Sequence, residues 1–115
     1  MALLPITVVE VEPFSREADR IWSEDERLEF ISFIAHNSEA GDVIVGSGGI
    51  RKVRWARKGM GKRGGVRVIY YFHDPSMPLF LLTVYAKGRR ADLSRGELKS
   101  MKKLVAQLRE TYGER

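Results

Sequence analysis

The sequence of 115 residues contains no cysteine and only two histidines, His36 and His73, and these absences limit its chemistry. Without cysteine there is neither a disulfide nor a thiolate metal site, and two histidines alone cannot build a zinc site. We therefore expect no metal and no other cofactor. The lack of cysteine also fits a reducing cytoplasm.

Long apolar runs are absent as well. No stretch approaches the roughly 20 apolar residues that span a bilayer. The N-terminal segment has no basic residue before its first acid, which favours a strand over a signal peptide. We expect a cytoplasmic protein with no membrane partner, and the length predicts a single domain over residues 1–115.

Positive charge, in contrast, is abundant and concentrated in the middle of the chain. Residues 1–45 hold three Arg and ten Asp or Glu, whereas residues 46–90 hold eleven Lys or Arg and one Asp. Residues 91–115 hold six basic and four acidic residues, and the formal net charge is +5. Such a segment attracts polyanions by counterion release, which favours nucleic acid as a partner. The alternative is a solvated basic loop, but the cations also fall on predicted strands.

The hydrophobic pattern predicts an α+β fold with the order β–α–α–β–β–β–α. The predicted strands are residues 5–11, 50–55, 66–73 and 79–86. The predicted helices are residues 15–37, with a break near Ser23, and a capped helix from Ser94 to Gly113. We expect a twisted, mainly antiparallel sheet, with the N-terminal helices and the C-terminal helix on one face and the cations on the other face or its rim.

Local signals support the helices and the connection between them. Acids follow Ser23, and Ser94 with Glu97 forms a capping-box pattern. The glycine-rich residues 41–49 lack the Gly-Lys-Ser/Thr of a phosphate-binding loop and are predicted to be a flexible connection. The expected apolar stripe of the second helix is Leu28, Ile31, Ile34 and Ala35, widened by Phe30 and Phe33.

Strand alternation predicts that three cations share one side of the sheet. Lys52 and Arg54 point to the same side of their strand, and Arg67 lies in the next, otherwise apolar strand. A cation is expensive to bury unpaired, so Arg67 is expected to join the other two in a cationic groove. The residues expected to cover or extend this groove are Arg57, Lys58, Lys62, Arg63, Lys87, Arg89 and Arg90.

The segments GSGGIRKVRW, GKRGGVRVIYYF and LFLLTVYAKGRRADLS resemble the RelE superfamily, and most of all its HigB branch. The similarity covers residues 46–110 well, whereas the N-terminal elements match in order only. GKRGGVRVIYY followed by VYAK at this spacing is the specific part. The resemblance implies a RelE-like fold of the microbial-RNase type and a toxin of a type II toxin–antitoxin system. It also implies metal-independent cleavage of messenger RNA in the ribosomal A site.

The resemblance also assigns roles by position. The implied catalytic residues are Lys52, Arg54, Arg67 and Lys87. The residues expected to bind RNA or the ribosome are Arg51, Arg57, Lys58, Lys62, Arg63, Arg89 and Arg90. Arg89 and Arg90 only approximate the arginine of the family, because Gly88 interrupts. Where RelE itself has a tyrosine, this chain has Asp92 and Leu93, which puts a stacking tyrosine there in doubt.

The expected reaction is attack of an RNA 2′-OH on the adjacent phosphodiester, which needs a base, charge stabilisation at phosphorus and a proton donor. Arginine is always charged, so Arg67, and after it Arg54, is expected to stabilise the phosphate. Lys52 can act as base if neighbouring cations such as Arg51 favour its neutral form. His73 is predicted to be an ordinary surface residue beside the Asp-Pro turn. The strand tyrosines Tyr70, Tyr71 and Tyr85 are predicted to be core residues rather than base-stacking ones.

The partners implied by the resemblance are messenger RNA on the ribosome, ribosomal RNA and a cognate antitoxin. We expect the antitoxin to be an acidic protein or, in the first place, a helix-turn-helix DNA-binding protein that covers the groove or binds the acidic N-terminal helices. Two alternatives stay open: a ParE-like inhibitor of DNA gyrase on the same fold, and a non-catalytic nucleic-acid-binding module. The strand cations favour the nuclease.

Overall fold

A computed structural model describes residues 5–57, 61–86 and 93–113. The elements are β1 (Val8–Glu10), α1 (Glu12–Ile21), α2 (Glu24–His36), β2 (Asp42–Val43), β3 (Ile50–Arg57), β4 (Gly61–Tyr71), β5 (Leu79–Ala86), α3 (Arg95–Leu108) and a final π-helical turn η1 (Arg109–Gly113). Among these elements no helix is long and apolar enough to cross a membrane.

The five strands form one sheet in the order β1-β5-β4-β3-β2. The pairs β2–β3, β3–β4 and β4–β5 are antiparallel, whereas β1 pairs with β5 in parallel. The sheet is therefore mainly antiparallel and the fold is α+β, as the sequence predicted.

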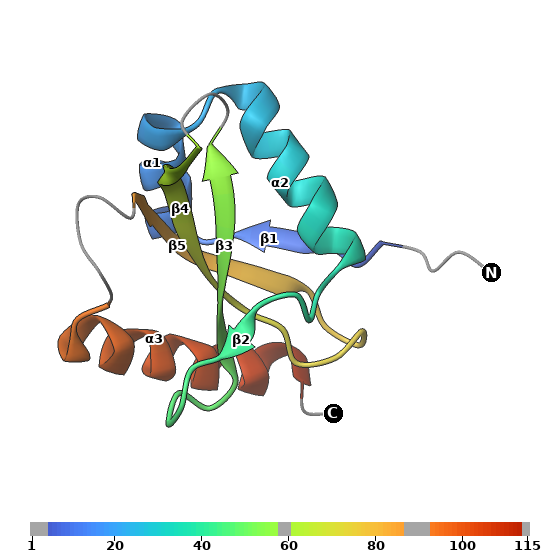
Figure 1. Cartoon of the computed structure of the whole chain (residues 1–115). Coiled ribbons are helices and arrows are strands. Elements are labelled where there is room, and N and C mark those ends of the chain that lie inside the picture. The colour runs from blue at the N-terminus through green and yellow to red at the C-terminus, as the bar shows by residue number, and fades with distance from the viewer. Residues whose placement is uncertain (1–4, 58–60, 87–92, 114–115) are drawn as a thin grey trace.

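The helices cover both faces of the sheet, with α1 and α2 on one side and α3 on the other (Figure 1). The prediction that they share one face is wrong. In β4, Val68 and Tyr70 pack in the core beneath α1 and α2, whereas Ile69 and Tyr71 pack in the core beneath α3 with Val105. A strand that is apolar on both sides needs cover on both sides, so one layer of helices cannot complete the core.

Several boundaries differ from the predicted ones at the N-terminal half. β1 is shorter than the predicted strand 5–11, and α1 starts at Glu12 rather than near Ser15. Pro13 does not merely end the strand, because it lies in the first helical turn, where its missing N–H is not needed. The predicted connection 41–49 contains the short strand β2, which pairs with β3.

The β3–β4 hairpin is longer than the sequence indicated. β3 reaches Arg57 and β4 starts at Gly61, and these two residues are paired. Most of the segment between the predicted strands 50–55 and 66–73 is therefore itself strand, because pairing between strands outweighs the low strand propensity of its glycines.

Both predicted capping serines are confirmed, since Ser23 and Ser94 each form a complete capping box. The buried residues of α2 are Phe30 and Ile34, both predicted for its apolar stripe, whereas Leu28, also predicted there, is 56% exposed. Leu28 is two positions from Phe30 and so points to another side of the helix, while the Phe30 ring stacks on Trp22.

Tyr70 ties the segment after α2 to the sheet. Its hydroxyl donates to the carbonyl of Ser38 at 2.9 Å and accepts the N–H of Gly41 at 2.8 Å. Burial raises the pKa of Tyr70, although the hydrogen bond from Gly41 acts in the opposite direction. A Cβ on Gly41 would lie 2.9 Å from the carbonyl oxygen of Lys52, so only glycine fits this close approach.

We predict that Tyr70→Phe lowers the free energy of unfolding by about 1–3 kcal/mol, because it leaves buried backbone groups without a partner. Tyr71→Phe is the matched control, since its hydroxyl makes no hydrogen bond with the described residues, and it should change stability by less than about 0.5 kcal/mol. Urea denaturation measures both. Equal effects of the two substitutions would contradict the role of the Tyr70 hydroxyl.

Candidate nucleic-acid interface

The β3–β4 hairpin places three cations on the sheet face that carries α3. Arg54 lies directly opposite Arg67, and Lys52 lies directly opposite Ile69, which packs in the α3 core. Directly opposite residues of an antiparallel pair project to the same face, so all three cations lie on this face. We call Lys52, Arg54 and Arg67 the cationic cluster; the residues are those that strand alternation had grouped together.

The central pair of the cluster is electrostatically unfavourable. Opposite side chains in such a pair have Cβ atoms about 4.5–5.5 Å apart, and like charges there destabilise the sheet. Arg54 is exposed and Arg67 is half-buried, and neither makes an ion pair with a described residue. Nε of Arg67 is buried and has no hydrogen-bond partner within the described ranges. Stability does not explain this arrangement, but a bound anion would relieve it.

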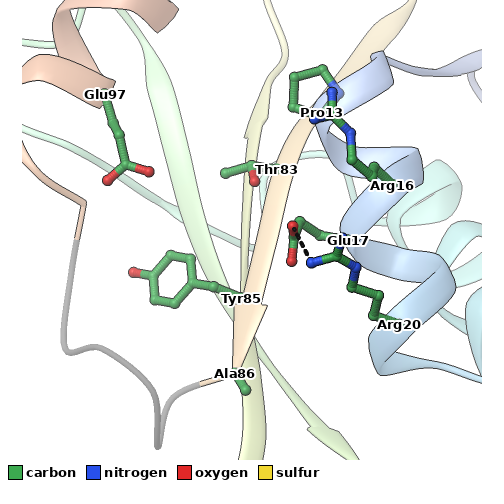
Figure 2. A pocket seen from close by; sticks show the side chains of 8 residues that line it. All are labelled: Pro13, Arg16, Glu17, Arg20, Thr83, Tyr85, Ala86 and Glu97. Atoms are coloured by element: carbon green, nitrogen blue, oxygen red, sulfur yellow. Dashed lines mark ion pairs between the residues drawn. The ribbon is translucent and has the colours of Figure 1, made fainter.

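Tyr85 continues the row across a third strand. It lies on β5 directly opposite Arg67 and is only 5% exposed. Figure 2 shows its ring and Glu97 on the α3 side of β5, away from α1. Tyr85 was predicted to be a core residue, and it is buried, but its place beside Arg67 also makes it the neighbour of the cationic cluster. The alternation of side chains along β5 was the sequence signal that could have placed Tyr85 beside the cationic cluster.

A hollow of about 430 Å³ lies between α1, β5 and α3 (Figure 2). Its cations come from α1, but Arg16 pairs with Glu12 at 3.1 Å and Arg20 pairs with Glu17 at 3.7 Å. These charges are balanced within one helix. The hollow is therefore a weaker candidate for an anion than the cationic cluster.

The third arginine of the acidic N-terminal half, Arg27, is also paired within the protein. Arg27 pairs with both Glu10 and Asp19. Burial acts against the charge of Arg27, but the hydrogen bonds to the two carboxylates outweigh it and raise its pKa. The described parts of α1 and α2 thus offer a surface in which acids exceed cations. No group of three His, Asp or Glu within the described ranges could hold a metal ion.

Arg51 is separated from the cluster although it is its neighbour in sequence. It lies opposite Tyr70, and its guanidinium donates to the carbonyls of Gly41 at 2.7 Å and Glu39 at 3.3 Å. It braces the turn after α2. Asp42, in the segment predicted to be a connection, lies opposite Lys52 on the edge strand β2 and so belongs to the same face as Lys52, which the sequence did not predict. A two-residue strand gives no periodic signal.

The other predicted site residues are only partly described. The backbones of Arg57, Lys62 and Arg63 lie in β3 and β4. Lys58, Lys87, Arg89 and Arg90 lie outside the described residues. The predicted surface position of His73 is confirmed: it is exposed and lies 3.3 Å from Asp74, whose pKa is lowered by hydrogen bonds from Ser76.

Comparison with known proteins identifies the family. A model of the family described as "RelE toxin of RelE / RelB toxin-antitoxin system" matches residues 10–114. The chain belongs to the RelE toxin family. It is thus a member of a family of toxins that are paired with antitoxins and inhibit translation, and the superfamily expected from the sequence is confirmed.

The fold of this RelE-family chain is also found in a solved structure. The chain resembles a free double arginine-to-alanine mutant of the E. coli toxin RelE, with a TM-score of 0.59 and 14% sequence identity. The match covers 89% of this chain and 98% of the E. coli chain. At this identity the likeness supports the fold, and it leaves the HigB branch a prediction.

The cationic cluster yields a prediction about stability. We expect Arg54→Gln to raise the free energy of unfolding at low salt by about 0.2–1 kcal/mol, because it removes a like-charge cross-strand pair. The gain should shrink as salt or phosphate screens the pair. Urea denaturation at two salt concentrations measures this effect.

Arg51→Gln is the matched control on the same strand. It should lower stability by about 1 kcal/mol, because Arg51 donates to two backbone carbonyls. If Arg54→Gln destabilises the protein as Arg51→Gln does, the described repulsion between Arg54 and Arg67 is wrong.

Proposed function

We propose that this RelE-family chain is a toxin that cleaves messenger RNA in the ribosomal A site and so stops translation. The observation that carries the proposal is the cross-strand pair Arg54–Arg67 with Lys52 beside it. Two guanidinium groups and an ammonium group on one sheet face suit a phosphodiester, because the anion offsets the repulsion between them.

The chemistry needs no cofactor. A base removes the proton of a 2′-OH, the oxygen attacks the adjacent phosphorus, and the 5′ oxygen leaves with a proton. The products are a 2′,3′-cyclic phosphate and a 5′-hydroxyl end. Arg67 and Arg54 donate to the non-bridging oxygens as charge builds on them. Lys52, about 7–8 Å diagonally from Arg67, is long enough to reach the same phosphate as base. We propose Lys87, which lies outside the described residues, as the proton donor.

The ribosome supplies what the cationic cluster does not. Arginine and lysine contacts to phosphate hold the backbone but read no sequence. A message held in one conformation in the A site brings its 2′-OH and phosphate to the cluster already aligned, and such alignment contributes much of the rate of a reaction of this kind. Messenger RNA and ribosomal RNA are therefore the proposed partners.

The proposed antitoxin is a helix-turn-helix DNA-binding protein. Members of this family are paired with an antitoxin. This chain offers an antitoxin two surfaces of opposite charge. An acidic segment would neutralise Arg54 and Arg67, whereas a basic segment would bind the acidic side of α1 and α2.

Arg67→Ala should lower the rate of messenger RNA cleavage by about 10²–10³-fold, the usual cost of removing one donor to a developing oxyanion. Arg16→Ala is the control, because Arg16 is an exposed arginine that is already paired with Glu12. Both variants should remain folded. Mapping of new 5′ ends on a reporter message in a reconstituted translation reaction measures the rates.

Two results would overturn the proposal. One is full cleavage by both Arg67→Ala and Lys52→Ala. The other is a wild-type chain that leaves messages intact but changes the superhelicity of plasmid DNA, as the ParE-like alternative predicts.

A further inference from the structure

The outer side of α3 carries a second group of cations that the proposed reaction does not use. It consists of Arg95, Lys99, Lys102 and Lys103. All four side chains are exposed, and none makes an ion pair with a described residue. We call these four residues the α3 basic surface. The exposed arginines of α1 differ, because Arg16 and Arg20 are each paired with an acid on the same helix.

Helix stability does not account for this placement. Arg95 is the first residue of α3, at the positive end of the helix dipole, and the last turn contains no basic residue. Cations stabilise a helix at the opposite end. Lys99 and Lys103 are four positions apart and so are neighbours of like charge, which is also unfavourable. The arrangement therefore suits an external polyanion better than it suits the isolated helix.

The surface is also shaped by a second element. The four cations border a hollow of about 460 Å³ together with Gly46, in the turn between β2 and β3. Gly46, Gly48 and Gly49 have positive φ angles, and a Cβ on Gly46 or Gly48 would meet nothing within 4 Å. The turn thus lies beside the helix with open space next to the cations.

The opposite side of α3 is already used in the core. Val105 is buried there, and Leu98, Met101 and Leu104 pack against the same cluster. An amphipathic helix that binds a lipid surface needs its apolar side free to enter the bilayer. This helix has no such side free, so its cations favour a hydrated polyanion over a membrane.

We propose that the α3 basic surface is a second RNA-binding site, which holds the phosphate backbone of a folded RNA. The cationic cluster and α3 lie on the same side of the sheet, so one large RNA particle can contact both without enclosing the protein. That the folded RNA is ribosomal rests on the proposed function. The cluster then acts on the message while α3 holds the particle that presents it.

The test compares two double variants in the full-length chain: Lys99→Gln/Lys103→Gln and Arg16→Gln/Arg20→Gln. Each removes two exposed cations that are four positions apart on a helix, so the loss of net charge is equal. Arg67→Ala is added to both, and to the reference chain, so that no RNA is cleaved. Binding to purified small ribosomal subunits is measured between 50 and 200 mM salt, because phosphate contacts set the salt dependence.

We expect the slope of log affinity against log salt to fall by about one unit for each lysine removed from α3, and to stay unchanged for the α1 variant. Equal slopes for both variants would overturn the proposal. The proposal would also be overturned if the α3 variant lost binding to vesicles that contain phosphatidylserine but kept its binding to ribosomal subunits. If the α3 lysines govern binding to folded RNA while the wild-type chain cleaves no message, this inference stands and the proposed function fails. If cleavage occurs but the slopes are equal, the reverse holds.

Discussion

The register of the β3–β4 hairpin is the constraint on which the site depends. It brings Arg54 and Arg67 face to face, an arrangement that costs free energy until an anion binds. On the opposite face the same register pairs Val53 with Val68 within the core under α1 and α2. A slip of one residue would drive the arginine side chains into that core. Packing on one side of the strand therefore enforces repulsion on the other.

Charge is divided between the two sides of the molecule. The arginines of α1 and α2 are balanced by neighbouring acids, so this side is left with excess negative charge. Arg54, Arg67 and the outer cations of α3 have no such balance among the described residues. Acidic and basic partners are thus expected to bind to different sides of the protein. The long-range electrostatic field orients each partner before contact.

Strand alternation predicted the cationic cluster because side-chain direction in a sheet has a strict period of two. Local patterns did not predict the placement of helices on both faces, since a doubly apolar strand does not reveal which helix covers which side. They left Arg57 and Gly61 outside the predicted strands, because glycine has a low strand propensity and this pairing depends on tertiary structure. Asp42 was missed because β2 is too short to show a period. The separation of Arg51 from Lys52 does follow from alternation, although its carbonyl acceptors could not be foreseen.

Two strand pairs of the sheet, β3–β4 and β1–β5, differ in how far apart their partners lie along the sequence. Arg54 and Arg67 are 13 positions apart, whereas Val8 and Leu79 of the parallel β1–β5 pair are 71 positions apart. Closing the longer loop costs more entropy, and such contacts slow folding. During synthesis the hairpin can form as soon as it leaves the ribosome, while β1 has no strand to join until β5 has emerged. The cationic cluster is thus expected to form before the sheet that contains it is complete.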